Sequence, residues 1–509
     1  MQNGIPLRVC YTLAMTRRSR LTRLAAIGLL AAAAIAATTL ALPTRAAHPD
    51  PAQSGPDDVW ARVGGLEAWY YENGYTESPP PAAPVPVTQS PITHLFAASP
   101  TLTATAYLPL LARNHSPDEF RGVWVTRFDW TGIGITPTTA KIDTIVNDVK
   151  TANFNAILFQ VRGTADAYYT PGLEPWAARM TGSATKTLGV DPGWDPLAYL
   201  IEHAHAQGIQ VHAYVNVFPA WLCDRIGPVN GTSPLHPFWK WTNESPPPNR
   251  TFYWREWSNN PLAAMNLLPR SDAGGTCDGE TYLGGYLWAS PAVTIVQSHV
   301  VSVVADLASR FDIDGVHLDL VRYSSSNYSS DPTTLQAYTQ ALALSPTLTF
   351  AQWQPGFQRA QISHLVSQAY SAVTTVKPDA WLSAAVWPNY ASGYNSYFQD
   401  SKGWLASGIV DVNMPMLYSS DIVTDLAAWT ARMQGFVGDS YGRYVVPGIH
   451  ADYDDFGDIV ARIDAARAAG APGVAIFSYG ALSLHGYFDD LGAGPFAIPA
   501  GIPKPGWKP

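Results

Sequence analysis

Position 319 holds the residue of this sequence best placed to do chemistry. Asp319 ends the run 315–319, in which apolar and polar residues alternate. Alternate side chains of a strand share one face, so His317 and Asp319 point the same way and the leucines beside them point the other way. A carboxylate on a buried face is costly unless it is paired or used. We therefore predict that Asp319 is catalytic; a structural ion pair with Arg162 or Arg322 is the alternative.

A second carboxyl group is needed if the chemistry is hydrolysis of a glycosidic bond. One carboxyl group then donates a proton to the leaving oxygen, and the other attacks carbon or activates water. Asp166 follows the apolar run 156–161 in a glycine-containing loop and is the predicted partner of Asp319. In the alternative interpretation, Asp166 organises its own loop by accepting backbone N–H groups. The weaker candidates are Asp129, Asp421 and Glu174.

Polar and aromatic residues near the ends of the other apolar runs are predicted to bind the substrate. A binding site combines aromatic surface with a few placed polar groups, and these residues supply both kinds. Each of them could instead serve only the fold. The predicted substrate-binding residues are Arg162, Tyr214, Asn216, His317, Arg322, Trp387, Tyr418, Tyr479 and Trp221.

No metal or cofactor is predicted. His203 and His205 are two residues apart in a helix-like segment, where their side chains diverge and cannot grip one ion. The sequence also lacks a GxSxG motif, a P-loop and a GxGxxG motif that opens a helix. The chemistry is therefore expected to rest on amino-acid side chains alone.

These residues need a scaffold that gathers strand ends, and strand-like and helix-like segments alternate from Phe120 onward. Continuous apolar runs that alternate with helices indicate a parallel sheet. Eight such units over about 370 residues predict an α/β fold, a (β/α)8 TIM barrel with its site at the C-terminal strand ends. The expected strands are 121–126, 156–161, 209–215, 315–320, 382–386, 410–416, 444–448 and 473–477. The expected helices are 140–151, 196–207, 292–310, 352–375, 397–406, 425–435, 456–469 and, weakly signalled, 482–491.

Two long connections, 218–288 and 323–350, follow the third and fourth strands on the side where a barrel keeps its site. The first contains six of the 18 Trp residues and both Cys223 and Cys277. It is either an aromatic wall for a chain-like ligand or a flap packed on itself. Trp221 follows the third strand closely, so it is the tryptophan expected nearest the mouth.

The ends of the chain differ in composition from the barrel. Arginines precede a long Ala- and Leu-rich stretch, which predicts a signal peptide over 1–47, with an uncleaved membrane anchor as the alternative. Seven prolines lie between Ser78 and Pro100, so 48–117 is predicted to be an extended Pro-rich spacer. The barrel is expected over 118–491 and a Pro-rich surface tail over 492–509. The protein is therefore expected to be secreted or attached to the cell envelope.

The composition narrows the class of partner. Hydrophobic residues make up 47% of the chain and charged residues 14%, so material for a large core is ample. The formal net charge is -9, although the first 47 residues hold six Arg and no acid. An acidic protein repels phosphate backbones, which excludes nucleic acid. We expect a monomer that meets the membrane only through its N-terminal segment, if that segment is not cleaved.

Several short motifs, taken in order, resemble the glycosyl-hydrolase-like 10 family over about residues 119–478. They are EFRGVW (119–124), QVR (160–162), ADAYY (165–169), EPW (174–176), TG (181–182), DPL (195–197), HAYVN (212–216), DGVHLD (314–319) and PMLY (415–418). The resemblance implies a (β/α)8 barrel that acts on bacterial glycans, with Asp319 as the functional carboxylate. Many relatives carry a second Asp directly after it, where this chain has Leu320.

The leading hypothesis is an exported glycoside hydrolase that cleaves O-glycosidic bonds of a bacterial polysaccharide, with peptidoglycan glycan strands as one candidate. The alternative of a different class is a non-catalytic barrel that binds glycans or tethers the cell wall. A third is a barrel with another hydrolytic chemistry. Release of product from a bound glycan separates the first from the second.

Cys223 and Cys277 are predicted to be bonded to each other, because both lie in the 218–288 connection and the chain is expected in an oxidising compartment. Cys10 would be removed with the signal peptide. Peptide mass spectrometry without reduction should recover one linked pair of peptides. Two free thiols would reject the disulfide.

Overall fold

The computed structural model describes residues 118–183, 186–222, 230–244, 253–257, 259 and 286–508. The expected signal peptide, the spacer, Cys223 and Cys277 lie outside these residues. No helix within the described part of the chain is long and apolar enough to cross a membrane.

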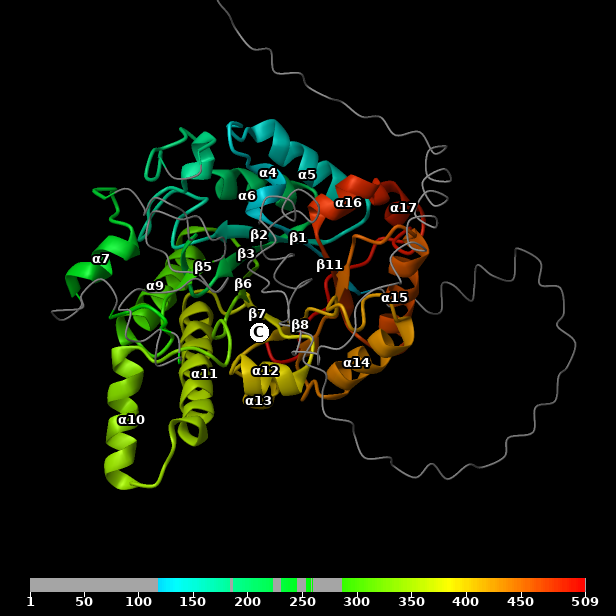
Figure 1. The fold of residues 1–509 in the computed structure, drawn as a ribbon. Helices are drawn as coiled ribbons and strands as arrows, with labels where there is room; N and C mark the ends of the chain where they lie inside the picture. Colours follow the sequence, from blue (N-terminus) through cyan, green and yellow to red (C-terminus); the bar gives the residue numbers. More distant parts are fainter. Residues whose placement is uncertain are drawn as a thin grey trace, which may run out of the picture. The chain divides into compact units, whose positions relative to one another are not determined.

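A parallel sheet of nine strands forms the centre of the fold (Figure 1). Its order is β10-β11-β1-β2-β3-β6-β7-β8-β9. The strands are β1 (Phe120–Val125), β2 (Ala156–Arg162), β3 (Gln210–Asn216), β6 (Gly315–Asp319), β7 (Trp381–Val386), β8 (Val412–Pro415), β9 (Tyr444–Val445), β10 (Gly448–His450) and β11 (Gly473–Phe477).

The strand predicted at 444–448 closes this sheet into a barrel. Its first part, β9, pairs with β8, and its second part, β10, pairs with β11 at the other end of the strand order. Pro447 stands between the two parts, where it has no N–H to give to a ladder. A bridge from Met416 to Gly448 carries the pairing across this break. β9 and β10 together are one barrel strand, so eight strands close and the predicted (β/α)8 fold is confirmed.

Helices surround the strands on the outside of the barrel (Figure 1). The capped starts were readable in the sequence: Asp195 accepts two N–H groups at the start of one helix, and Asp425 does the same for another. The predicted helix 397–406 is wrong, since two shorter helices separated at 397–400 take its place. The helices are α5 (Thr139–Thr151), α6 (Pro196–Ala206), α9 (Thr294–Arg310), α11 (Phe350–Val376), α12 (Tyr390–Ser396), α13 (Ser401–Ala406), α14 (Leu426–Gly438), α15 (Phe456–Ala468), α16 (Tyr479–His485) and α17 (Tyr487–Ala493).

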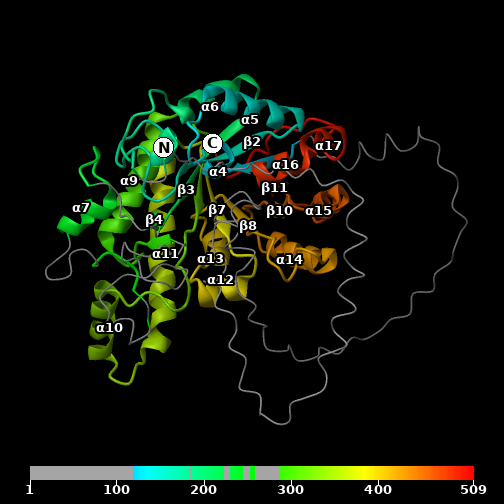
Figure 2. The same ribbon diagram turned by 45° about the horizontal axis from the view of Figure 1, so that its top comes forward.

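The two long connections contain regular structure of their own. After β3, the strand β4 (Pro219–Leu222) pairs antiparallel with β5 (Tyr286–Trp288), and α7 (Pro237–Glu244) lies between them in sequence. After β6, the helix α10 (Pro332–Leu344) runs beside the first part of α11 (Figures 1 and 2). The long connection predicted at 323–350 therefore contains a helix that was not among the expected ones. Asp331 caps α10 and Pro332 occupies its first turn, which was the available signal.

The C-terminal tail covers the N-terminal end of the barrel and does not simply lie along the surface as predicted. The backbone N–H of Glu119 donates to Gly501 O at 2.9 Å. Asp411, directly before β8, accepts the Trp507 indole N–H at 2.7 Å and pairs with Lys508 Nζ at 2.9 Å. The tail is thus hydrogen-bonded to the starts of β1 and β8.

The barrel interior is filled by aromatic rings in layers. In the lower layer, the His212 ring meets Phe120 and Trp381 edge to face, with centroids 5.8 and 5.9 Å apart. Burial lowers the pKa of His212 to about 4, so its ring is neutral at pH 7. Such a ring needs space on the neighbouring strand, and Gly315 provides it, since a Cβ there would lie 2.3 Å from His212 Nδ1.

Replacing Gly315 with alanine should destabilise the fold, because the methyl group would clash with His212 and with the Trp381 carbonyl oxygen, 2.8 Å away. We expect a loss of about 1–3 kcal/mol in the free energy of unfolding, as for other overpacked cores. Urea unfolding of Gly315→Ala measures it. Gly435→Ala is the control, since Gly435 lies in α14 with no atom within 4 Å of its added Cβ and should be neutral or stabilising. Equal stability of both variants would contradict the packing.

Candidate active site

Asp319 is the last residue of β6 and is buried at the C-terminal end of the barrel, with 4% of its surface exposed. Tyr214 lies on the neighbouring strand β3, and its hydroxyl donates to Asp319 Oδ2 at 2.7 Å. The N–H of Leu320 donates to Oδ1 at 2.6 Å. Leu320 has a φ of +51°, a conformation rare for a branched residue, and so the chain turns directly after Asp319. Both carboxylate oxygens are therefore held in place from two sides.

His317 lies one layer below Asp319 and is fully buried. The Trp124 indole N–H donates to His317 Nε2 at 3.0 Å, so Nδ1 carries the ring proton and donates to Ser383 Oγ at 2.9 Å. Burial lowers the pKa of His317 to about 3. The ring is neutral with both nitrogens used inside the barrel. The structure thus gives His317 a supporting position in place of the predicted contact with substrate.

Asp166 is also buried, in the loop that follows β2. Its Oδ1 accepts the backbone N–H of Thr164 at 2.7 Å, which is the loop-organising bond considered as the alternative. Burial raises the pKa of Asp166, and the Thr164 bond and the charge of Arg127 offset this only in part. A carboxyl group with a raised pKa can hold a proton for donation. Asp166 therefore combines the structural bond with the property of a general acid.

Arg162 is the centre of a buried ion pair and does not contact Asp319. Its Nε and Nη2 donate to the two oxygens of Glu174, both at 2.8 Å, and His299 Nε2 contacts Glu174 Oε1 at 2.8 Å. Burial alone would raise the pKa of Glu174, but Arg162 and His299 outweigh it and lower the pKa to about 2. Glu174 is thus ionised at pH 7 and cannot be the proton donor considered in its place. Arg162 was predicted to bind substrate, but in the structure its buried guanidinium donates to Glu174 instead.

The same guanidinium connects this pair to the catalytic position. Arg162 Nη1 donates to the backbone oxygens of Asn216 and Val217 at the end of β3. The N–H of Val217 in turn donates to the backbone oxygen of Asp319 at 2.9 Å. Asn216 itself is fully buried beside Asp319 in the strand register. Arg162 therefore positions the backbone on which Asp319 stands.

Aromatic rings surround the end of the barrel. Trp387 stacks on Tyr397 with centroids 3.8 Å apart, and the Arg322 guanidinium lies 5.2 Å from the Trp387 ring centre and 5.2 Å from that of Trp288. After the neighbouring strand β8, Tyr418 stacks on Phe477 of β11 with centroids 5.3 Å apart. Flat apolar rings with polar edges suit the faces of sugar rings.

Two residues that sequence reasoning did not select lie near these groups. His450 ends β10 beside Tyr418, with ring centroids 6.0 Å apart, and burial lowers its pKa to about 4. Its position as the last residue of a strand was the available signal. Glu256, 2% exposed, accepts the Ser324 hydroxyl at 2.6 Å. No periodicity marks Glu256, because it lies within the irregular 218–288 connection.

Two predicted binding residues do not join this group. The Tyr479 hydroxyl donates to Asp148 Oδ2 at 2.6 Å on α5, so the side chain packs in the helical layer outside the sheet. Trp221 is only 5% exposed, and its ring meets the edge of His236 at 5.3 Å. Trp241 and Trp254 are buried against each other at 4.8 Å. These three tryptophans belong to the same buried cluster as the barrel residues. The described part of the 218–288 connection therefore packs onto the barrel core and does not present these rings as a stacking wall.

Among the residues with described positions, no three His, Cys, Asp or Glu side chains come together in a group able to hold a metal ion. The weaker carboxylate candidates have structural partners: Asp129 accepts the Thr126 N–H at 2.7 Å, and Asp421 pairs with Arg432 at 2.8 Å. The buried carboxyl groups of Asp319, Asp166 and Glu256 are thus the candidates for chemistry among the described residues.

The sequence of this chain matches a known protein family. The family model described as glycosyl hydrolase-like 10 matches residues 119–249 and 270–436. Glycosyl hydrolase DigH of Escherichia coli K12 is 24% identical over 340 residues, 61% of this chain and 68% of that protein. Glycosyl hydrolase YngK of Bacillus subtilis is 24% identical over 334 residues, 62% of this chain and 56% of that protein. The chain thus spans about two thirds of DigH and just over half of YngK.

Solved structures with a similar chain path include the PgaB (BpsB) glycoside hydrolase domain from Bordetella bronchiseptica, at 14% identity and a TM-score of 0.49, covering 74% of this chain and 98% of that one. An Anoxybacillus alpha-amylase is 15% identical with a TM-score of 0.42, covering 75% and 79%. The family match, which ends before β9, includes β6 with Asp319 and the loop after β2 with Asp166. Because it covers more than half of the chain, the protein belongs to the glycosyl hydrolase-like 10 family and is a glycoside hydrolase.

Proposed function

We propose that this protein is exported and cleaves O-glycosidic bonds in a bacterial polysaccharide, with the glycan strands of peptidoglycan as its substrate class. The observation that carries the proposal is the buried Asp319 carboxylate, held by Tyr214 and the Leu320 N–H at the C-terminal end of β6. Export is supported by the apolar stretch 24–42 behind a cluster of arginines and by the Pro-rich segment that follows.

The two carboxyl groups suit different roles in this reaction. Asp319 accepts hydrogen bonds at both oxygens, which stabilises negative charge, and it acts as nucleophile or as the base that activates water. Asp166 has a raised pKa and donates the proton to the leaving oxygen. Leu320 stands where many relatives carry a second acid, and its side chain is buried at 2% exposure. The chemistry therefore depends on Asp319 without an acidic neighbour.

Asp319→Asn should abolish turnover with little change in melting temperature, because asparagine keeps the shape and the Leu320 contact but removes the charge. We expect a fall in kcat of about 10²–10⁴-fold. Release of reducing ends from purified peptidoglycan glycan strands measures turnover, and calorimetry measures the melting temperature. Asp166→Asn is the parallel variant for the acid.

Three results would contradict the proposal. Lost stability with retained turnover would make Asp319 a structural residue. Binding of glycan strands by the wild type without product release would favour the non-catalytic barrel. Full activity of Asp166→Asn would move the acid to another residue, with Glu256 the first to examine.

Glu174→Gln should lower the free energy of unfolding, because Glu174 is the partner of the buried Arg162. Removing one partner of a buried ion pair costs about 3–5 kcal/mol, because Arg162 is left without its carboxylate. The folded pKa of Glu174, about 2, lies below its ordinary value of 4.5. Its stabilising contribution is therefore complete above about pH 4.5 and is lost as the pH falls toward 2.

Urea unfolding at pH 7 and at pH 3 tests this for wild type and variant. The difference in stability between the two proteins should be larger at pH 7 than at pH 3. Lys377→Gln serves as control, since its partner Asp312 is an exposed carboxylate. An equal difference in unfolding free energy at both pH values would show that the ionised Glu174 does not stabilise the fold.

A further inference from the structure

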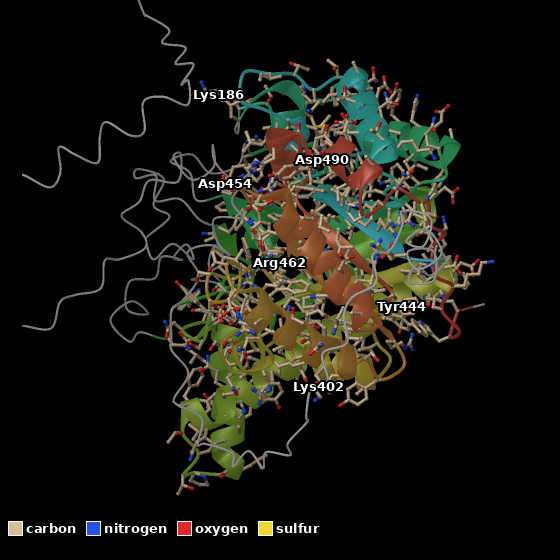
Figure 3. The ribbon with its side chains drawn as sticks, turned by 90° about the vertical axis from the view of Figure 1, so that its right-hand side faces the viewer. Lys186, Lys402, Tyr444, Asp454, Arg462 and Asp490 are labelled. Carbon is tan, nitrogen blue, oxygen red and sulfur yellow. The ribbon has the colours of Figure 1, made fainter. Side chains whose placement is uncertain are left out.

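A pocket, called the flank pocket here, lies beside α12 and α13, and Asp319 is not among its lining residues. It is formed by α12, α13 and the turn between α14 and β9, and its volume is about 470 Å³. Lys402, one of its lining residues, is labelled in Figure 3 on α13. Pockets that hold small ligands commonly measure about 300–1,000 Å³. The space is therefore large enough for one or two sugar rings.

Tyrosine side chains line much of this pocket. Tyr394 is 40% exposed and Tyr441 is 55% exposed. The Arg359 guanidinium lies 3.8 Å from the centre of the Tyr394 ring and donates to the Tyr394 carbonyl oxygen at 3.1 Å, which fixes the ring from one side. Tyr441 has a φ of +50°, an unusual conformation for an aromatic residue. Large rings that are held in place and left exposed indicate a binding surface.

Polar groups stand between these rings. Lys402 Nζ pairs with Asp439 at 2.9 Å and lies 5.8 Å from the centre of the Tyr390 ring. The Tyr390 hydroxyl is buried and has no hydrogen-bond partner among the described residues. Asn395, exposed on α12, and Asp400, which caps α13, complete the lining used here. The pocket thus offers an ammonium, a carboxylate, an amide and phenol groups around aromatic faces.

This combination selects the class of ligand. A sugar ring presents C–H groups on its faces, which stack on aromatic rings, and hydroxyl groups at its edge, which need both donors and acceptors. Asp400 in the lining and Asp439 beside it disfavour a phosphate or another anion. A purely apolar ligand would cover the Asn395 amide without pairing it.

We propose that this flank pocket binds a sugar unit of the polysaccharide at a second site, separate from the active site. Glycan held there keeps the polymer on the enzyme between cleavage events, so effective concentration at the active site rises. The inference uses the glycan class of the proposed function but does not require that Asp319 cleave it.

The test uses the full chain in an Asp319→Asn background, so that binding is measured without turnover. Binding to insoluble purified peptidoglycan is measured by co-sedimentation, with and without the double change Tyr394→Ala and Tyr441→Ala. We expect about tenfold weaker binding for the double variant, because loss of an aromatic stacking contact typically lowers affinity about tenfold. Asn395→Ala is a second variant that removes an edge contact without removing a ring. Leu344→Ala, at a residue 90% exposed on α10, is the control and should bind as the parent does.

The same tyrosine changes in the active enzyme separate the two sites. On soluble tetrasaccharide fragments of the same peptidoglycan glycan, kcat/KM should be unchanged, because so short a chain does not need the flank pocket. Binding of peptidoglycan that is equal in all variants, or absent in the parent, would overturn the inference. An equal loss on tetramers and on peptidoglycan would overturn it too, because the tyrosines would then act through the fold. If the wild type binds peptidoglycan but releases no product, the proposed function is contradicted, and the inference about the flank pocket still holds.

Discussion

The buried charge of Arg162 is the constraint on which the catalytic end of the barrel depends. A guanidinium with 1% exposure cannot stay there without compensation, and Glu174 with His299 supplies it. The remaining donors of Arg162 reach the backbone oxygens of Asn216 and Val217, and Val217 reaches Asp319. The ion pair in the barrel wall thus fixes the position of the C-terminal end of β3. Asp319 keeps its position although its neighbour Leu320 is in a strained conformation.

The interior below Asp319 is polar in places but carries no charge on its histidine rings. His212 and His317 occupy successive layers, and burial keeps both neutral. The Asp319 carboxylate is therefore held by the hydrogen bonds from Tyr214 and the Leu320 N–H. The small residue Gly315 makes room for one of these rings. Packing and electrostatics are therefore set by the same few strand positions.

The alternation of apolar runs and helices predicted most of the fold. The strand at 473–477 was predicted at its observed bounds, and the strand at 315–320 ends one residue early. The helix α10 was missed although its Asp-Pro start marked it, and it buries little of its surface. At the candidate site, the alternation of side chains placed His317 and Asp319 on one face of their strand, whereas Tyr214 was predicted to bind substrate and instead donates to Asp319. The alternation could not show that Arg162 is paired with Glu174, or that the Tyr479 side chain points toward α5. These contacts depend on the course of the loops, which has no periodic pattern in the sequence.

The attachment of the C-terminal tail has a practical consequence for orientation. Asp118 and Gly501 form a bridge, and Lys508 Nζ donates to the carbonyl oxygen of Ala380 directly before β7. Both contacts lie at the N-terminal ends of the strands, opposite the end that carries Asp319. A linker joined directly after Lys508 therefore starts from the N-terminal end of the barrel. Enzyme immobilised on a sensor chip or bead through such a linker will present the catalytic end to the solution, where an insoluble glycan can reach it.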